Sequence, residues 1–419
     1  MTRTKASRKQ NEIRIFRNIG TLLTLAGVAE KDGRQVQEQD LGRIDKAAMV
    51  VENGRLTWVG PQKKLPKISA KKTTDIDLDG QTVLPGFVEC HTHTIFSGSR
   101  AAEFEQRNRG VSYSEIAAGG GGILSTMQQT RNASASQLLQ LGERRLRKFV
   151  EQGVTTVEMK TGYALDFENE LKCLQVMKKL RGARVVSTYL GPHAVPPEFS
   201  SAEEYVKFCS EKVLPEICRK KLTDRVDIFV EKGFFSAAVA RPYLQAAKEM
   251  GFSIAIHADQ LSLSGGAELA VEYEATSADH LLQIGEREIQ KLAKSKVTCV
   301  LLPLADLYMN CPYPLARSLI AAGARVALAT DFNPGSSPSQ DVSLVGLLAR
   351  LQMKMTLPEV IAAYTYSAAA ALSREKELGS LEVNKYADFF STELDWTDLF
   401  YSAGGLMPTK VFSSGDEVL

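Results

Sequence analysis

The stretch TVLPGFVECHTH, residues 82–93, joins an apolar segment typical of a buried strand to two histidines that are separated by one residue. From residue 83 onward the chain repeats one pattern, in which a short apolar segment precedes a longer amphipathic one. Eight strand-like segments follow this rule: TVLPGFVE, VTTVEMK, RVVSTYL, VDIFVE, FSIAIH, ATSAD, VTCVLL and RVALAT.

Helix-like segments lie between these strands, and each ends at a glycine that can act as a C-cap. They include SQLLQLGERRLRKFVEQG, ENELKCLQVMKKLRG, ARPYLQAAKEMG and PYPLARSLIAAG. Parallel neighbouring strands require such helical crossovers, and eight strand–helix units over about 250 residues form a closed barrel. The fold class that we predict is therefore α/β, with a (β/α)₈ TIM-like barrel.

Both ends of the chain have a different, β-rich pattern. The first eighty residues show short strand candidates, beginning with IRIFRNIGTLLTL, and turn signals at Asn53-Gly54 and Asp79-Gly80. After the helical segment TLPEVIAAYTYSAAAALS, the tail returns to strand and turn character. We expect a small β-sandwich domain built from both termini, with residues 1–84 and 373–419 forming the sandwich and residues 85–372 the barrel.

The composition is that of an ordinary globular protein. The 419 residues are 44% hydrophobic and 24% charged, and 51 Lys and Arg against 49 Asp and Glu give a formal net charge of +2. Such a balance provides no basic footprint for nucleic acid. No apolar run is long enough for a membrane span, and the short run at residues 19–29 suits a strand better than a signal peptide. The six scattered cysteines contain no CxxC pair, so we expect reduced thiols and a cytoplasmic protein.

The five histidines provide the main functional signal. Each follows or ends a predicted strand, and Asp331 follows the eighth strand in the same way; the histidines are His91, His93, His193, His257 and His280. A single histidine at such a position is more often structural than functional. Because a barrel of this kind builds its active site at the carboxyl ends of its strands, all five together predict one site.

A metal centre is the chemistry that this set favours. His91 and His93 are two residues apart in an extended segment, so both rings point to the same side. Together with His257 and Asp331 they would offer three imidazoles and one carboxylate. This donor set suits Zn²⁺ or iron with one position left for water.

The motifs around these residues resemble a known family. LPGFVECHTH is similar to the opening of the metal-dependent amidohydrolase superfamily. Six longer stretches resemble, within that superfamily, the imidazolonepropionase family of histidine degradation: residues 91–127, 157–174, 189–199, 257–270, 275–281 and 327–340. The resemblance extends from about residue 13 to the C-terminal strands.

The resemblance implies a reaction and a set of site residues. The metal ligands would be His91, His93, His257 and Asp331, holding one ion, Zn²⁺ or Fe²⁺/Fe³⁺. The catalytic residues would be Asp331, as proton carrier, and His280, beside the reactive water. The reaction would be hydrolysis of the cyclic amide of 4-imidazolone-5-propanoate to N-formimino-L-glutamate, and a homodimer is expected. The substrate contacts would fall on Arg100, Tyr113, Tyr163, His193, Gln260, Asn333, Gly335 and Ser336.

Several of these assignments also have a physical reason. Arg100 offers a planar fork that matches a carboxylate, so the expected partner is a small-molecule substrate with a propionate group. The turn DFNPGSS offers Asn333 and backbone N–H groups for a carboxylate that forms during the reaction. The glycine run at residues 119–122 follows a helical segment rather than a strand, which favours a loop near the site over a dinucleotide motif.

Alternatives remain at this point. An aminohydrolase that deaminates a purine or pyrimidine would share the four ligands, but related deaminases have a glutamate where this chain has Gln260. A binuclear enzyme would want a carboxylated lysine near Glu231 and Lys232. A third alternative is a non-catalytic binding protein with the barrel fold. The segment at residues 301–320 departs from the family pattern, which leaves its effect on the pocket open.

Overall fold

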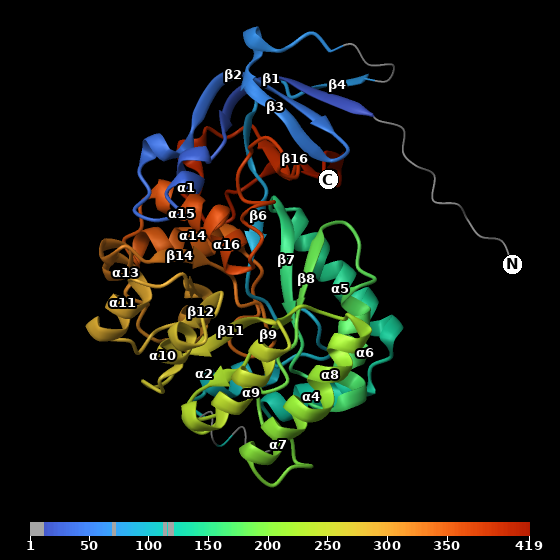
Figure 1. Ribbon diagram of the computed structural model, residues 1–419, viewed down its shortest axis with the longest axis vertical. Helices are drawn as coiled ribbons and strands as arrows, with labels where there is room; N and C mark the ends of the chain where they lie inside the picture. The colour runs from blue at the N-terminus through green and yellow to red at the C-terminus, as the bar shows by residue number, and fades with distance from the viewer. Residues whose placement is uncertain (1–11, 69–72, 112–114, 116–120) are drawn as a thin grey trace, which may run out of the picture.

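The computed structural model describes residues 12–68, 73–111, 115 and 121–419. Strands from both ends of the chain form one eight-stranded sheet in the order β17-β16-β15-β5-β1-β2-β3, with β4 also paired to β1 (Figure 1). These strands are β1 (Ile13–Leu23), β2 (Arg43–Glu52), β3 (Arg55–Pro61), β4 (Thr73–Asp77), β5 (Thr82–Pro85), β15 (Phe389–Thr392), β16 (Pro408–Ser413) and β17 (Asp416–Glu417).

This sheet has its own apolar core. The rings of Phe16, Phe389 and Phe412 lie 4.6–5.1 Å apart and join β1 to β15 and β16. The predicted Asn53-Gly54 turn connects β2 and β3, and both residues have positive φ. The predicted Asp79-Gly80 turn is also present, with positive φ at both residues, and it joins β4 to β5, which both pair with β1 in the parallel direction. The predicted domain boundaries stay a prediction.

The eight predicted barrel strands are all present: β6 (Phe87–Glu89), β7 (Val154–Lys160), β8 (Arg184–Thr188), the pair β9 (Arg225–Val226) and β10 (Phe229–Val230), β11 (Ser253–Ala258), β12 (Ser277–His280), β13 (Thr298–Leu301) and β14 (Arg325–Leu328). Neighbours pair in parallel from β6 to β8 and from β10 to β14. Single parallel bridges, Tyr189 to Val226 and Thr92 to Phe332, connect these two groups. The α/β barrel class is confirmed.

Helices cover the barrel (Figure 1). They are α1 (Ala26–Glu30), α2 (Ala101–Asn108), α4 (Ile123–Asn132), α5 (Ala135–Val150), α6 (Phe167–Met177), α7 (Ala202–Phe208), α8 (Leu214–Lys220), α9 (Ala237–Glu249), α10 (Gly266–Glu272), α11 (Glu286–Ala293), α12 (Pro303–Met309), α13 (Ala316–Ala322), α14 (Val342–Leu351), α15 (Leu357–Ala363) and α16 (Tyr366–Ala371). Within the described residues, none has the length and apolar character needed to cross a membrane.

Helix α5 shows why these segments form helices. Ser134 and Gln137 form a reciprocal capping box, in which each side chain accepts a hydrogen bond from the other residue's backbone N–H. Leu138, Leu146 and Phe149 are buried on one side of the helix. Gly153 follows with φ 82°, a conformation that glycine adopts without the steric cost of a Cβ, and the chain then enters β7.

Two predicted elements are divided in the structure. The single helix expected over TLPEVIAAYTYSAAAALS is broken between α15 and α16, because the carbonyl of Tyr364 accepts a hydrogen bond from Val88 N of strand β6. Strand VDIFVE is interrupted between β9 and β10, where the Asp227 carboxylate accepts hydrogen bonds from the N–H groups of Ile228 and His257. At both points a backbone N–H of another strand donates to the interrupted segment.

The first predicted strand, residues 82–89, is also divided, and its two halves belong to different units. β5 pairs in the terminal sheet and β6 in the barrel, with Gly86 between them. Gly86 N donates to the carbonyl of Asp388. A Cβ at Gly86 would lie 2.2 Å from Thr155 Oγ1 and 2.8 Å from Thr155 Cβ, so the two units approach closely at this residue.

We expect Gly86→Ala to destabilise the protein by about 1–3 kcal/mol, because the added methyl group forces strand β7 away from the junction. The control is Gly285→Ala, where a Cβ would meet only Glu288 Oε2 at 3.4 Å and the cost should stay below about 1 kcal/mol. Urea unfolding curves of the two variants provide the measurement. Equal stabilities would contradict the close approach at Gly86.

Candidate metal centre and active site

A cavity of about 330 Å³ opens at the carboxyl ends of the barrel strands. It gathers residues that are far apart in the sequence, and most of those predicted for the site line it. His91 lies beneath the lining and is fully buried. Tyr113 falls outside the described residues. The predicted residues that line the cavity are His93, Arg100, Tyr163, His193, His257, Gln260, His280, Asp331, Asn333, Gly335 and Ser336.

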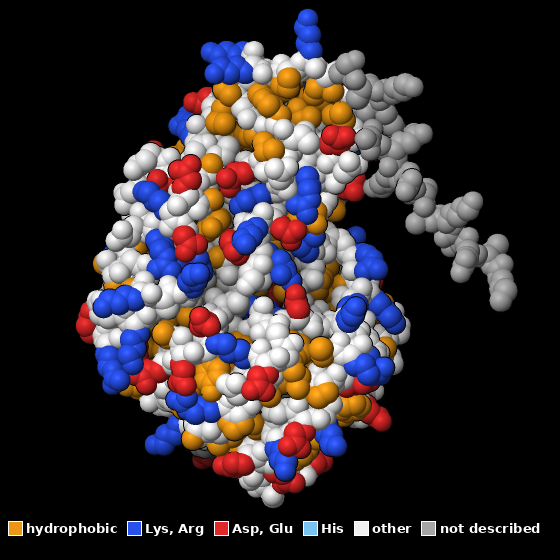
Figure 2. Space-filling view, viewed as in Figure 1, with side chains coloured by type: hydrophobic (Ala, Val, Ile, Leu, Met, Phe, Trp, Pro, Cys, Tyr) orange, Lys and Arg blue, Asp and Glu red, His pale blue; other side chains and the backbone are white. Residues whose placement is uncertain are grey.

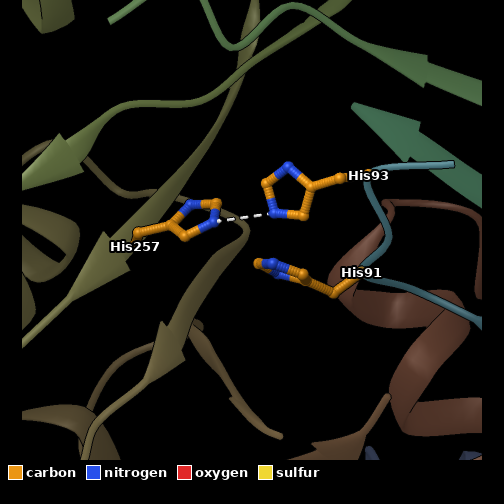
Figure 3. A group of neighbouring side chains, drawn as sticks. All are labelled: His91, His93 and His257. Carbon is orange, nitrogen blue, oxygen red and sulfur yellow. Dashed lines mark hydrogen bonds between the residues drawn. The ribbon is translucent and has the colours of Figure 1, made fainter. Parts of the chain in front are cut away.

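Three imidazoles converge at the base of this cavity. Figure 3 shows the rings of His91, His93 and His257 pointing toward one another from the segment after β6 and from β11. His257 Nε2 lies 3.4 Å from His93 Nε2. Asp331, after β14, brings its Oδ1 within 3.4 Å of Nε2 of His91 and of His93. The four side chains predicted as metal ligands therefore lie together.

The donor spacing fits a bound ion. Ligands about 2.1 Å from a tetrahedral Zn²⁺ ion are roughly 3.4 Å from one another, and these three donor separations are each 3.4 Å. His91 Nε2 and Asp331 Oδ1 are buried, and neither completes a hydrogen bond with another described residue. Buried polar atoms without a partner are costly, so these atoms are suited to a cation. His91, His93, His257 and Asp331 could hold one.

Two further carboxylates orient the imidazoles. Asp279 Oδ2 lies 2.6 Å from His91 Nδ1, and Asp227 Oδ2 lies 3.0 Å from His257 Nδ1. A ring that donates its Nδ1–H to a carboxylate directs the lone pair of its Nε2 toward a metal. The sequence alone did not single out Asp227 and Asp279. Their signal is a carboxylate within or at the end of a predicted strand, in the segments VDIFVE and ATSAD.

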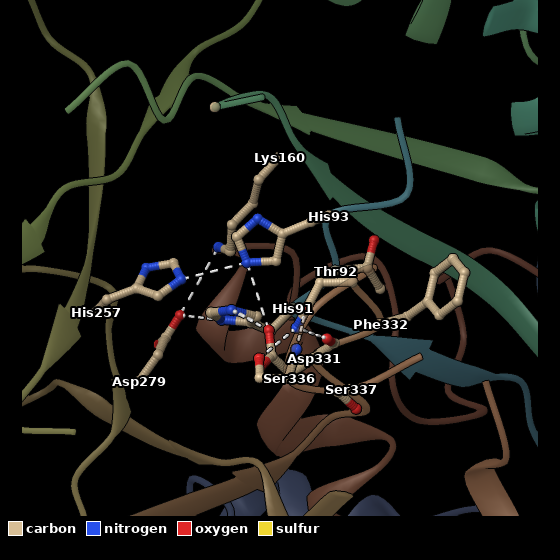
Figure 4. Close-up of polar contacts among 12 residues, drawn as sticks. His91, Thr92, His93, Lys160, His257, Asp279, Asp331, Phe332, Ser336 and Ser337 are labelled. Atoms are coloured by element: carbon tan, nitrogen blue, oxygen red, sulfur yellow. Dashed lines mark hydrogen bonds and ion pairs between the residues drawn. The ribbon is translucent and has the colours of Figure 1, made fainter. Parts of the chain in front are cut away.

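A fully buried lysine completes this network (Figure 4). Lys160, at the end of β7, places its Nζ 2.9 Å from Glu158 Oε1, 2.9 Å from Asp227 Oδ2 and 3.8 Å from Asp279 Oδ2. Its ammonium thus neutralises the carboxylates that orient His91 and His257. Lys160 was also missed in the sequence, where VTTVEMK was interpreted only as a strand.

The buried charges make the centre favour a cation. Burial lowers the pKa of His91, but the carboxylates of Asp279 and Asp331 outweigh it and raise that pKa to about 9. Burial raises the pKa of Asp331, yet its contacts with His91 and His93 hold that pKa well below the usual range. A proton on His91 therefore lies between two carboxylates, and a metal ion would supply positive charge at the same place.

The two remaining histidines stay neutral at ordinary pH. Burial lowers the pKa of His193 to about 4 and that of His280 to about 3. His193 Nδ1 donates to the carbonyl of Gly162 at 2.9 Å, and its ring stacks on His93 at 5.2 Å. His280 has φ 76°, a left-handed conformation that is uncommon outside glycine and is often found at active sites.

Arg100, at the start of α2, also lines the cavity. Its Nε donates to Glu103 Oε2 at 2.7 Å, and its Nη1 packs against Gly335, where a Cβ would come within 2.1 Å. Glu103 Oε1 also accepts a hydrogen bond from Gly122 N at 2.9 Å. Gly122, the last residue of the glycine run, is therefore hydrogen-bonded to the carboxylate that pairs with Arg100.

The turn after β14 differs from expectation in one respect. Its N–H groups at Gly335 and Ser336 were expected to face a forming carboxylate, but both donate to Asn333 Oδ1 at 2.8 Å. Asn333 Nδ2 in turn donates to the carbonyl of Asp331 at 2.7 Å. The Asn333 amide therefore shapes the loop that carries the metal-ligand candidate Asp331.

The alternative lysine bridge at the end of strand four does not match the geometry. Lys232 is exposed, and the Glu231 carboxylate accepts hydrogen bonds from the N–H groups of Leu261 and Ser262. Glu231 therefore fixes the loop after β11. This loop carries Gln260, which lines the cavity.

The segment at residues 301–320 also contributes to the cavity. The sequence alone did not decide whether it would. Met309, in α12, lines the wall, and Arg107 of α2 lies beside it with its Nη1 3.3 Å from Met309 Sδ. Neither residue was predicted. Their signal is weak, because a methionine or arginine on a short helix is more often a packing or surface residue.

Sequence comparisons agree with this geometry. A model of the amidohydrolase family matches residues 82–418. The chain is 60% identical over 406 residues to an imidazolonepropionase of Bdellovibrio bacteriovorus, covering 96% of each chain. It is 43% identical to the imidazolonepropionase of Parabacteroides distasonis, with 90% of this chain and 92% of that protein covered.

Solved structures share the fold. A triazine hydrolase variant superposes with a TM-score of 0.74 at 15% identity, covering 97% of this chain and 94% of that one. An adenosine deaminase from Xanthomonas campestris with bound zinc gives a TM-score of 0.69 at 17% identity, covering 97% and 92%. At these identities the likeness extends to the fold alone.

We expect Lys160→Met to lower the free energy of unfolding of the metal-free protein by about 3–5 kcal/mol, because it leaves buried carboxylates without their cation. The control is Lys248→Met, whose ion pair with Glu274 is exposed at 45% and 81% and should contribute at most about 1 kcal/mol. Urea unfolding measures both. If Lys160→Met were as stable as the control, the buried charge network would not stabilise the fold.

Proposed function

Because this chain belongs to the amidohydrolase family and, within it, to the imidazolonepropionases, we propose that its cavity hydrolyses the cyclic amide of 4-imidazolone-5-propanoate to N-formimino-L-glutamate. The observation that carries the proposal is the arrangement of the cavity. Three imidazoles and a carboxylate converge in it, and the Arg100 guanidinium lines the same cavity. This combination of groups suits a small ring that bears a carboxylate on a short chain.

The residues present fit a single metal ion, bound by His91, His93, His257 and Asp331. We propose Zn²⁺ or iron (Fe²⁺/Fe³⁺). Such an ion, when bound, lowers the pKa of water and polarises a carbonyl group. Asp279 and Asp227 would keep two of the imidazoles in the tautomer that ligates through Nε2.

Asp331 would transfer the proton, and His280 would stabilise the negative charge that develops during the reaction. Both line the cavity. The Asp331 carboxylate accepts a proton from the attacking water and passes it to the ring nitrogen as the C–N bond breaks. The neutral His280 ring can donate one hydrogen bond to the carbonyl oxygen while negative charge develops on it. The products are one new carboxylate and one formimino nitrogen, with no ammonia released.

The other lining residues would position the substrate. Arg100 offers two N–H groups to the propionate, and Tyr163, His193 and Gln260 surround the ring. Tyr163 and His193 have their rings 5.3 Å apart, so they form one wall. Asn333, Gly335 and Ser336 would act through the loop that carries Asp331 and packs against Arg100. Tyr113 stays a proposed contact from the resemblance alone.

The aminohydrolase alternative is not favoured. Two relatives at 60% and 43% identity are named imidazolonepropionase. Gln260 also lacks the carboxyl group that would carry protons to a purine or pyrimidine ring. The non-catalytic binding protein is also not favoured, because the four ligand candidates place their donor atoms at distances that suit a metal ion.

The remaining expectations concern the localisation, the oligomeric state and the binding partners of the enzyme. We propose a cytoplasmic homodimer that binds neither nucleic acid nor membrane. All six cysteines are free, which suits a reducing compartment. Acidic and basic side chains are intermixed over the face seen in Figure 2, as a net charge of +2 would suggest. Light scattering of the purified protein tests the dimer.

We expect a chelator to abolish hydrolysis of 4-imidazolone-5-propanoate without unfolding the barrel, since a fold of this size has its own core. Loss of ultraviolet absorbance of the substrate measures activity, circular dichroism measures folding, and metal analysis measures occupancy. Adding back Zn²⁺ or Fe²⁺ should restore the rate. Full activity in metal-free protein, or ammonia release from guanine or adenosine with the imidazolone untouched, would contradict the proposal.

We expect Arg100→Met to lower kcat/KM by roughly 30-fold to several thousand-fold, because removing one partner of a desolvated charge pair costs about 2–5 kcal/mol. The variant also leaves Glu103 beside the substrate carboxylate without its partner. Metal content should equal that of the wild type. An imidazolone without the propionate should lose far less, and unchanged kcat/KM on the normal substrate would remove Arg100 from carboxylate binding.

A further inference from the structure

Helix α2 presents a second guanidinium to the cavity. Arg107 is seven residues, or two helical turns, after Arg100, so the two side chains project from the same face of the helix. Both line the cavity, and both contact Gly335: Arg100 packs over its Cα, and Arg107 Nη2 lies 3.3 Å from its carbonyl oxygen. The two arginines therefore meet at one end of the cavity.

Their charges are balanced differently. Arg100 donates through Nε to Glu103 Oε2 at 2.7 Å, so its positive charge already has a carboxylate partner. Among the residues that the structure describes, no carboxylate lies within ion-pair distance of Arg107. The net positive charge at this end of the cavity therefore comes from Arg107.

Arg107 is held in place by groups that do not neutralise it. Its Nη1 lies 3.3 Å from the thioether sulfur of Met309, and its carbon Cζ lies 5.5 Å from the centre of the Phe104 ring. A thioether and a backbone carbonyl are weak partners for a group with five N–H donors. These contacts orient the guanidinium and leave donor capacity for a ligand.

We propose that Arg107 is a second carboxylate-recognition residue: its unneutralised guanidinium selects a substrate with a carboxylate, while Arg100, paired with Glu103, orients that carboxylate. This inference rests on the proposed function, because it assigns specificity within the same cavity. An uncompensated charge in a partly closed cavity attracts an anion more strongly than one in open solvent. Met309 would then serve as a positioning residue for Arg107.

The test measures binding rather than turnover. The metal-loaded enzyme is titrated calorimetrically with two probes that share ring and chain length, 3-(imidazol-4-yl)propanoate and 3-(imidazol-4-yl)propan-1-ol. In Arg107→Met, affinity for the propanoate should fall about 10- to 100-fold, as expected for hydrogen bonds to a charged group. Affinity for the alcohol should change less than about threefold. Unchanged preference for the propanoate, or equal loss for both probes, would overturn the proposal.

Two further variants separate charge from structure. Arg109→Met removes the same charge from the end of the same helix, but Arg109 is 74% exposed and paired with Glu105, so the preference should stay at the wild-type value. Arg107→Lys keeps the charge and should retain most of the preference. If Arg107→Lys or Arg109→Met lost as much of the preference for the propanoate as Arg107→Met, the charge of Arg107 would not be the cause of that preference.

Kinetics provide an independent readout. A carboxylate contact that exists equally in the bound substrate and in the transition state affects KM more than kcat. Arg107→Met should therefore raise KM for 4-imidazolone-5-propanoate with a smaller change in kcat, and a reduced kcat with unchanged KM would oppose the proposal. If the wild type did not hydrolyse this compound, the proposed function would fail, and the probe titrations would still decide the role of Arg107.

Discussion

The balance of buried charge around Lys160 is the constraint on which the site depends. Its ammonium lies within ion-pair distance of three carboxylates. One of these, Asp279, hydrogen-bonds to His91, and another, Asp227, lies 3.0 Å from Nδ1 of His257. None of these groups is stable alone in a dry interior, since an unpaired buried charge is strongly disfavoured. The positions of His91 and His257 are therefore fixed by partners that cannot move independently of one another.

The same kind of interaction connects the strands of the barrel at its carboxyl rim. Glu89, at the end of β6, accepts a hydrogen bond from Thr330 N after β14, and Glu158, near the end of β7, accepts one from Thr92 N. These carboxylates replace regular ladder bonds where the first strand meets the last and where it meets the second. Closure of the barrel and orientation of the site thus share one polar network, which lies beneath the cavity.

The sequence predicts the barrel well because alternating strand and helix segments are a local property, and it predicts which histidines lie together because histidines at strand ends are conspicuous. It does not predict where partners from other elements interrupt a segment. At the break at Tyr364 the partner is Val88 N from β6, and at the break at Asp227 it is the His257 N–H from β11. Periodicity reports that a side chain is buried and says nothing of its partner, which is why it does not single out Lys160, Asp227 and Asp279.

The metal-ligand candidates and the two arginines of the cavity come from different kinds of element. The candidates follow or end barrel strands, whereas Arg100 and Arg107 lie at the start of and within α2, and Met309 lies in α12. Changes in α2 or α12 leave the Lys160 network untouched, because neither helix contributes to it. Structures at 15–17% identity share this fold. The division lets such a barrel keep one metal-binding base while its helices and loops change which ligand is recognised.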